Sequence, residues 1–272
     1  MLIYSLRDGD MPGDEEYLMS LDVENITFSY GERCVVDQCS FSLPRGQVVC
    51  LLGRNGSGKT TLLRLANRSL QPEKGRITID GTDIHSFTRK RLARLIAFVP
   101  QSHNAVFGYT ARDMTVMGRN PHMPMFARPS QQDYQLAEEA MRQVGIYELK
   151  DRCYMDMSGG ERQLVFLARA LAQQASYYLL DEPTAHLDFY NQHALMKTLR
   201  KIVEQQGCGA LIALHDPNLA FYYADQVIML RQGRIVNAGS VTDTMTSSNL
   251  SQLYNMQLKV VSLDGQNMVI AK

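Results

Sequence analysis

The stretch from residue 48 to residue 65 constrains the possible folds of this chain most tightly. It joins an apolar run, VVCLL, to a glycine-rich turn, GRNGSGKT, and then to a helix-forming run, TLLRL. The turn matches the pattern G-x-x-x-x-G-K-[ST] through Gly53, Gly58, Lys59 and Thr60. Its backbone N–H groups and the positive end of the following helix suit a phosphate. We therefore predict nucleotide binding here, the alternative being a strand–helix turn with spare glycines.

Composition narrows the class of protein. The chain has 272 residues, enough for one large domain or a domain with a subdomain. Its 28 basic and 28 acidic residues cancel, which argues against long nucleic-acid contacts, and we expect no nucleic-acid partner. Five cysteines without a C-x-x-C pair favour reduced thiols in the cytoplasm. No apolar run approaches the ~20 residues of a membrane span, so a membrane role would require a partner.

The first eighteen residues differ from the rest of the chain. They are polar and acidic and lack the apolar core of a signal peptide, so we expect a disordered arm over residues 1–18. Met19 heads the first patterned segment and is a second candidate for the start of translation. We expect one domain over residues 19–272.

Three near-continuous apolar runs predict an α/β fold with a parallel sheet. They span residues 48–52, 177–180 and 210–214, and a helical segment follows each of them. Strands without polar alternation are typical of a sheet that helices cover on both faces. Asp181 and Glu182 end the second run and His215 ends the third. Because such strands end at the same edge of a sheet, we expect these side chains to meet the glycine-rich turn there.

Other segments complete the expected architecture. Strand-like runs at residues 23–29 and 35–43 predict an N-terminal antiparallel β portion. Residues from about 104 to 160 lose strand character and predict an inserted helical subdomain. A tail at residues 258–263 resembles one further strand.

A second glycine-rich segment begins a helix. Ser158 and Glu161 have the spacing of a capping box, so a well-capped helix would explain them. Gly159 and Gly160, however, occupy the first helical positions, where glycine costs helix stability. They suit a helix whose N–H groups a phosphate approaches.

In this order the segments resemble the ATP-binding subunit of an ABC transporter, over roughly residues 20–250. The most restrictive feature is Ser-Gly-Gly-Glu placed before an apolar strand that ends in Asp-Glu-Pro-Thr. The resemblance implies a P-loop ATPase core that binds ATP and Mg²⁺ and hydrolyses ATP. The residues that it assigns to ATP binding are Tyr30, Gly53, Asn55, Gly56, Ser57, Gly58, Lys59, Thr60, Thr61, Ser158, Gly159, Gly160, Glu161 and Asp188.

The resemblance also assigns metal binding and catalysis. Thr60, Gln101 and Asp181 correspond to the groups around Mg²⁺. Glu182 corresponds to the catalytic base that polarises water, although a second carboxylate of the metal site is the alternative. His215 corresponds to a histidine that contacts the γ-phosphate or orients Glu182, against a histidine satisfied at a strand end. Gln101 and Lys59 complete the catalytic set.

Three positions depend on context. Tyr30 corresponds to an aromatic that stacks on adenine, whereas composition by itself favours packing on the sheet. Met157 stands where the family commonly has leucine. His186 replaces a usually small residue just before Asp188, which makes coupling across a dimer less certain there.

The family architecture implies partners and a location. Two copies pack head to tail, so that the Ser158 segment of one completes the ATP site of the other. This homodimer drives two transmembrane permease subunits and, indirectly, an extracytoplasmic or periplasmic substrate-binding protein. The expected location is peripheral, at the cytoplasmic face of the inner (plasma) membrane.

Within the family the chain most resembles the ATPases of bacterial importers for iron–siderophores, haem or vitamin B12. The segments concerned are MGRNP at 117–121, LHDPNLA at 214–220 and a short tail after residue 239. Methionines and aromatics at 105–126 suit docking of a permease helix, or else form subdomain core. The alternatives are another class of importer, a soluble ABC ATPase without a transport role, and a P-loop kinase.

Overall fold

The computed structural model of the chain describes residues 19–101, 108–185 and 187–272. Our expectations for the arm at residues 1–18, for Phe107 and for His186 lie outside the described residues. No helix within these three ranges is long and apolar enough to cross a membrane.

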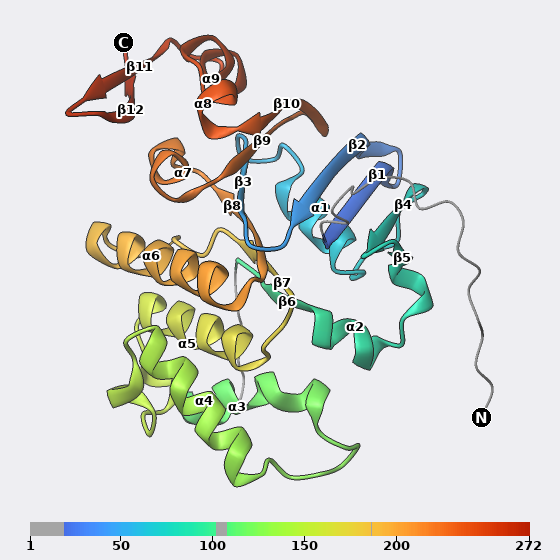
Figure 1. Cartoon of the computed structure of the whole chain (residues 1–272), viewed down its shortest axis with the longest axis vertical. Helices are drawn as coiled ribbons and strands as arrows, with labels where there is room; N and C mark the ends of the chain where they lie inside the picture. The colour runs from blue at the N-terminus through green and yellow to red at the C-terminus, as the bar shows by residue number, and fades with distance from the viewer. Residues whose placement is uncertain (1–18, 102–107, 186) are drawn as a thin grey trace, which may run out of the picture.

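A six-stranded sheet lies at the centre of the molecule (Figure 1). Its strands are β3 (Val48–Leu52), β6 (Ile96–Val99), β7 (Tyr177–Asp181), β8 (Gly209–Leu214), β9 (Gln226–Arg231) and β10 (Arg234–Ser240). They lie in the order β10-β9-β3-β8-β7-β6, and all neighbours pair in parallel except β10, which runs antiparallel to β9. The predicted parallel sheet is confirmed.

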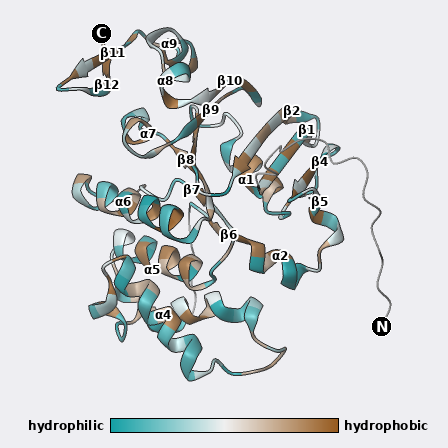
Figure 2. Ribbon diagram, viewed as in Figure 1, coloured by the Kyte–Doolittle hydropathy of each residue, from teal (hydrophilic) through white to brown (hydrophobic). Residues whose placement is uncertain are grey.

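Both faces of this sheet are buried, as its sequence predicted. Every residue of β3, β7 and β8 is buried, and these strands form a brown centre between helices with teal outer surfaces (Figure 2). Val48, Cys50 and Leu52 belong to one core cluster, whereas Val49 and Leu51 belong to the other. The helices around the sheet are α1 (Lys59–Ala66), α2 (Arg89–Leu95), α5 (Gly159–Ala172), α6 (Phe189–Gln206), α7 (Pro217–Tyr223), α8 (Val241–Thr244) and α9 (Ser247–Tyr254).

The predicted N-terminal antiparallel portion is a four-stranded sheet. It consists of β1 (Ser20–Tyr30), β2 (Arg33–Pro44), β4 (Lys74–Ile79) and β5 (Thr82–Asp83). The order is β2-β1-β4-β5. Its apolar face shares a core cluster with α1 and with one face of β3, so the two sheets enclose α1 between them (Figure 1).

Helices occupy the sequence between β6 and α5. They are α3 (Ala111–Val116), the 3₁₀ helix η2 (Met117–His122), α4 (Gln131–Gln143), and the 3₁₀ helices η3 (Tyr147–Leu149) and η4 (Tyr154–Asp156). Buried Arg119 fastens η2 to the end of α5, because its Nη1 donates to the carbonyl of Ala172 at 2.8 Å. Gly118 approaches α5 so closely that a Cβ would lie 2.1 Å from the Arg169 carbonyl oxygen. The division into domain and subdomain stays a prediction.

The C-terminus differs from our expectation. The single strand predicted there is a hairpin of β11 (Leu258–Leu263) and β12 (Gln266–Ala271). Asp264 and Gly265 both have positive φ, +50° and +78°, which is the backbone of a tight hairpin turn. An Asp-Gly pair is a sequence signal for such a turn, but the second strand was not among the predicted elements.

Candidate functional site

The glycine-rich turn joins β3 to α1, and two of its glycines are required by contacts. A Cβ on Gly53 would lie 2.4 Å from the Leu230 carbonyl oxygen. Gly58 has φ +109°, and a Cβ there would lie 2.7 Å from the carbonyl oxygen of Val35. Gly58 is also the N-cap of α1 and offers no side-chain cap to its first turn. The N–H groups at this helix start therefore remain available to an anion.

Lys59 is almost fully buried beneath this turn. Its Nζ donates to the Gly53 carbonyl at 2.8 Å and lies 3.7 Å from Glu182 Oε1. Burial lowers the pKa of Lys59, and the neighbouring carboxylates of Glu182 and Asp181 oppose that shift. A buried cation with incomplete compensation is well suited to bind additional negative charge, such as a phosphate.

Asp181 ends β7 and carries the signs of a metal ligand. Its side chain is buried, and Oδ1 has no hydrogen-bond partner within the described part of the chain. Burial raises the pKa of Asp181, while a hydrogen bond with Thr60 opposes this. A cation beside the bare oxygen would offset the cost of burying this carboxylate. Thr60 and Asp181 therefore fit Mg²⁺, which takes few protein oxygens when phosphate supplies others.

Glu182 is the meeting point of three segments. It lies just after β7 in the left-handed region, with φ +52°, a strained conformation for a glutamate. Gln101 Nε2, beyond β6, donates to Oε2 at 2.5 Å, and His215 Nε2, after β8, lies 2.5 Å from Oε1. The expected convergence at the carboxyl edge of the sheet is observed. Gln101 touches Glu182 in this structure, so its role as a magnesium ligand stays a prediction.

A cavity of about 400 Å³ lies in front of these groups. Its lining residues are Arg33, Val35, Asn55, Gly56, Gly58, Lys59, Thr60, Thr61, Gln101 and Glu182. Arg33 and Val35, which the turn at Gly31 brings back on β2, were not among the predicted site residues. Tyr30 pairs with Arg33 in that hairpin and is about half exposed, packing edge-on against Phe28 at 4.9 Å. Tyr30 thus packs against Phe28 while about half of its surface stays exposed, and stacking on a base stays a prediction.

The Ser158 segment forms a separate site. Ser158 Oγ accepts from the N–H of Glu161, and the Glu161 carboxylate accepts from the N–H of Ser158 at 2.7 Å, so the predicted capping box exists. A cavity of about 660 Å³ adjoins this helix start and is lined by Ser158, Gly159, Gly160, Glu161 and Asp188 among others. It shares no lining residue with the cavity at Lys59.

Comparison with known proteins gives one consistent result. A family model described as ABC transporter matches residues 36–185. An iron chelatin transport ATP-binding protein of Helicobacter pylori is 35% identical over 93% of this chain and 100% of its own length. The iron(3+)-hydroxamate import ATP-binding protein FhuC of Bacillus subtilis is 32% identical over 89% of this chain and 90% of its own. A solved metal-chelate type ABC transporter, in an inward-facing conformation, matches with a TM-score of 0.81 and 30% identity, covering 94% of this chain and 98% of that one.

Proposed function

The chain belongs to the ABC transporter family, as an ATP-binding subunit, and on this premise we propose that it hydrolyses ATP to power the import of a metal chelate. The cargo would be an iron–siderophore, haem or cobalamin. Similarity to iron-chelate import ATPases over about nine-tenths of the chain supports the cargo class. The observation that carries hydrolysis is the convergence of Gln101 and His215 on Glu182, beside buried Lys59.

Each residue has a defined task in this proposal. Lys59 and the N–H groups of the glycine-rich turn bind the phosphates, and Thr60 and Asp181 hold Mg²⁺, which neutralises charge on the transferred phosphoryl group when bound. Glu182 accepts a proton from the attacking water. His215 and Gln101 hold the Glu182 carboxylate in place through its two oxygens.

The Ser158 segment requires a second copy of the chain. Phosphoryl transfer depends mainly on positioning and charge stabilisation, and the helix start at Ser158 provides N–H donors for an anion. Because its cavity is separate from that of Lys59, we propose a head-to-tail homodimer with two ATP molecules at the interface. ATP closes this dimer and hydrolysis opens it. Asp188, which adjoins the Ser158 cavity, lies at the same interface.

Two membrane permease subunits are the proposed partners, at the cytoplasmic face of the plasma membrane. A substrate-binding protein outside that membrane delivers the cargo. The docking surface that we propose includes Met125 and Phe126, which are 82% and 94% exposed between η2 and α4. Met114, by contrast, is 5% exposed and belongs to the core, which is the alternative role given above for these methionines.

Reconstitution tests this function. The subunit is isolated in complex with its membrane permease and placed in liposomes. ATP hydrolysis is then measured with and without the cognate binding protein, loaded with ferric siderophore, haem or cobalamin. We expect stimulation by one loaded binding protein and ATP-dependent accumulation of its cargo. Equal hydrolysis under all conditions, without uptake, would contradict the transport role. Stimulation only by a sugar or amino-acid system would assign another class of importer.

A further inference from the structure

Two aromatic side chains project from the first turn of α6. Phe189 and Tyr190 follow Asp188 directly, and both are 78% exposed. Phe189 is held by a ring contact with His193, at 4.5 Å between centroids, and His193 Nδ1 lies 2.9 Å from the Tyr223 hydroxyl. Large aromatics that are ordered yet exposed are characteristic of protein interfaces.

The place of this pair indicates which interface it serves. Asp188 and Asn191, which flank the pair in sequence, line the cavity at Ser158. Phe189 and Tyr190 do not line that cavity, but they lie in the same helical turn as Asp188 and Asn191, next to the half-site that, in the proposed dimer, receives the glycine-rich turn of the other copy. In the dimer, the surface beside the glycine-rich turn of one copy therefore faces Phe189 and Tyr190 of the other copy.

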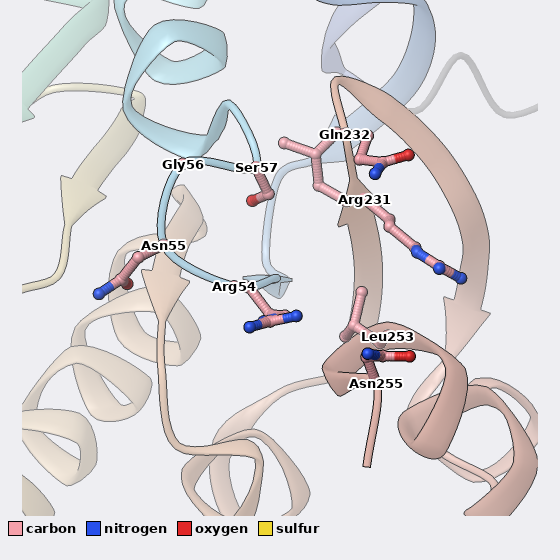
Figure 3. A pocket seen from close by; sticks show the side chains of 9 residues that line it. Arg54, Asn55, Gly56, Ser57, Arg231, Gln232, Leu253 and Asn255 are labelled. Carbon is pink, nitrogen blue, oxygen red and sulfur yellow. The ribbon is translucent and has the colours of Figure 1, made fainter.

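A pocket of about 260 Å³ borders the outer side of that turn. The glycine-rich turn curves along one side of it, and the β9–β10 turn and the end of α9 form the other (Figure 3). Asn55 and Gly56 line both this pocket and the nucleotide cavity. The pocket therefore adjoins the half-site at Lys59, and the aromatic pair adjoins the half-site at Ser158.

The chemistry of the pocket suits an aromatic side chain with a hydroxyl group. Arg54 and Arg231 line it, and neither forms an ion pair within the described ranges. Buried Leu253 supplies apolar surface. The Ser57 hydroxyl, on a side chain only 6% exposed, has no hydrogen-bond partner in the described part of the chain. Unpaired guanidinium groups stack on aromatic faces, and tyrosine adds a polar tip.

We propose that Tyr190 of one copy inserts into the pocket formed by Arg54, Arg231 and Leu253 of the other copy, with Phe189 packing at its rim. Because a two-fold dimer repeats each contact, the two insertions clamp both ATP sites at once. This inference rests on the proposed head-to-tail dimer, and Arg54, Arg231 and Leu253, which form the proposed contact, are not among the residues assigned to ATP binding. Since Asn55 and Gly56 belong to both cavities, the insertion also connects dimer formation to nucleotide occupancy.

The test measures dimer formation in the full chain carrying Glu182→Gln, with MgATP, by sedimentation. Adding Tyr190→Ala should raise the dissociation constant of the dimer about tenfold or more, while the affinity of the single chain for ATP stays unchanged. Arg54→Ala should weaken it as well, and the double variant should be little worse than either single one, because both remove the same contact. Leu263→Ala removes another exposed apolar side chain, at the end of β11, which has no part in the proposed contact; it is the control and should have no effect.

Cross-linking provides an independent measurement. With Cys34→Ser as background, because Cys34 is exposed, Tyr190→Cys together with Arg231→Cys should give an inter-chain disulfide under mild oxidation only when MgATP is present. A Glu182→Gln protein that stays monomeric with ATP would refute the proposed dimer itself. A dimer that forms normally with Tyr190→Ala, shows additive losses in the double variant, or gives no cross-link would refute the insertion alone.

Discussion

Replacing Glu182 by glutamine tests the proposed chemistry most directly. The carboxylate accepts from Gln101 and His215 through different oxygens and lies beside Lys59. Glutamine has nearly the same shape but only one acceptor oxygen. It can therefore accept a hydrogen bond from Gln101 or from His215, but not from both through separate oxygens. The substitution removes the base while leaving the phosphate-binding Lys59 in place.

The expected magnitude follows from the role of the group. Loss of a positioned general base costs about 10²–10⁴ in rate, which corresponds to about 3–5 kcal/mol in activation free energy. A hydrogen bond to a charged group contributes about 1.5–3 kcal/mol, so the altered contacts with Gln101 and His215 are of comparable size. We expect turnover to fall at least a hundredfold and ATP to remain bound in a stable dimer.

The assay combines phosphate release with sedimentation in MgATP. Glu204→Gln is the control. It makes the same chemical change at a glutamate that forms an exposed ion pair with Arg200 on α6 and does not line the cavity. That control should retain wild-type turnover. Hydrolysis by the Glu182→Gln protein within tenfold of the wild type would refute the argument and assign Glu182 to the metal site.

Three further outcomes are expected. Lys59→Ala should lower ATP affinity at least tenfold in equilibrium titration, because it removes the buried cation; unchanged affinity would place the phosphates elsewhere. Ser158→Arg should stop hydrolysis while the single chain still binds ATP, and retained turnover would exclude a shared site. The backbone N–H of Ser158 lowers the pKa of Glu161 from its ordinary value near 4.5, so the stabilisation of α5 by this carboxylate is fully present above that value and is lost as the pH falls through the lowered pKa. Glu161→Gln should therefore lower the melting temperature at pH 7 and lower it less in acid, as the pH falls through the lowered pKa of Glu161; an equal loss at both would contradict this linkage.

Local patterns predicted much of the architecture correctly. The run at β3, the capping box at Ser158 and the apolar run at β8 each depend on residues within one segment. Such features are determined by spacing, burial and backbone preference over a few positions. The second strand of the C-terminal hairpin was missed, although its Asp-Gly turn is also local.

By itself, the sequence determined which chemical groups this protein possesses and which strand or helix end carries each one. Only the tertiary structure decided how distant segments combine. Gln101 and His215 reach Glu182 because β6, β7 and β8 end at one edge, and Gly58 must be glycine because β2 brings the Val35 carbonyl against it. The pocket beside Arg54 likewise needs α9, some two hundred residues away in sequence. Contacts of this kind depend on how the layers pack, and no local pattern of residues encodes them.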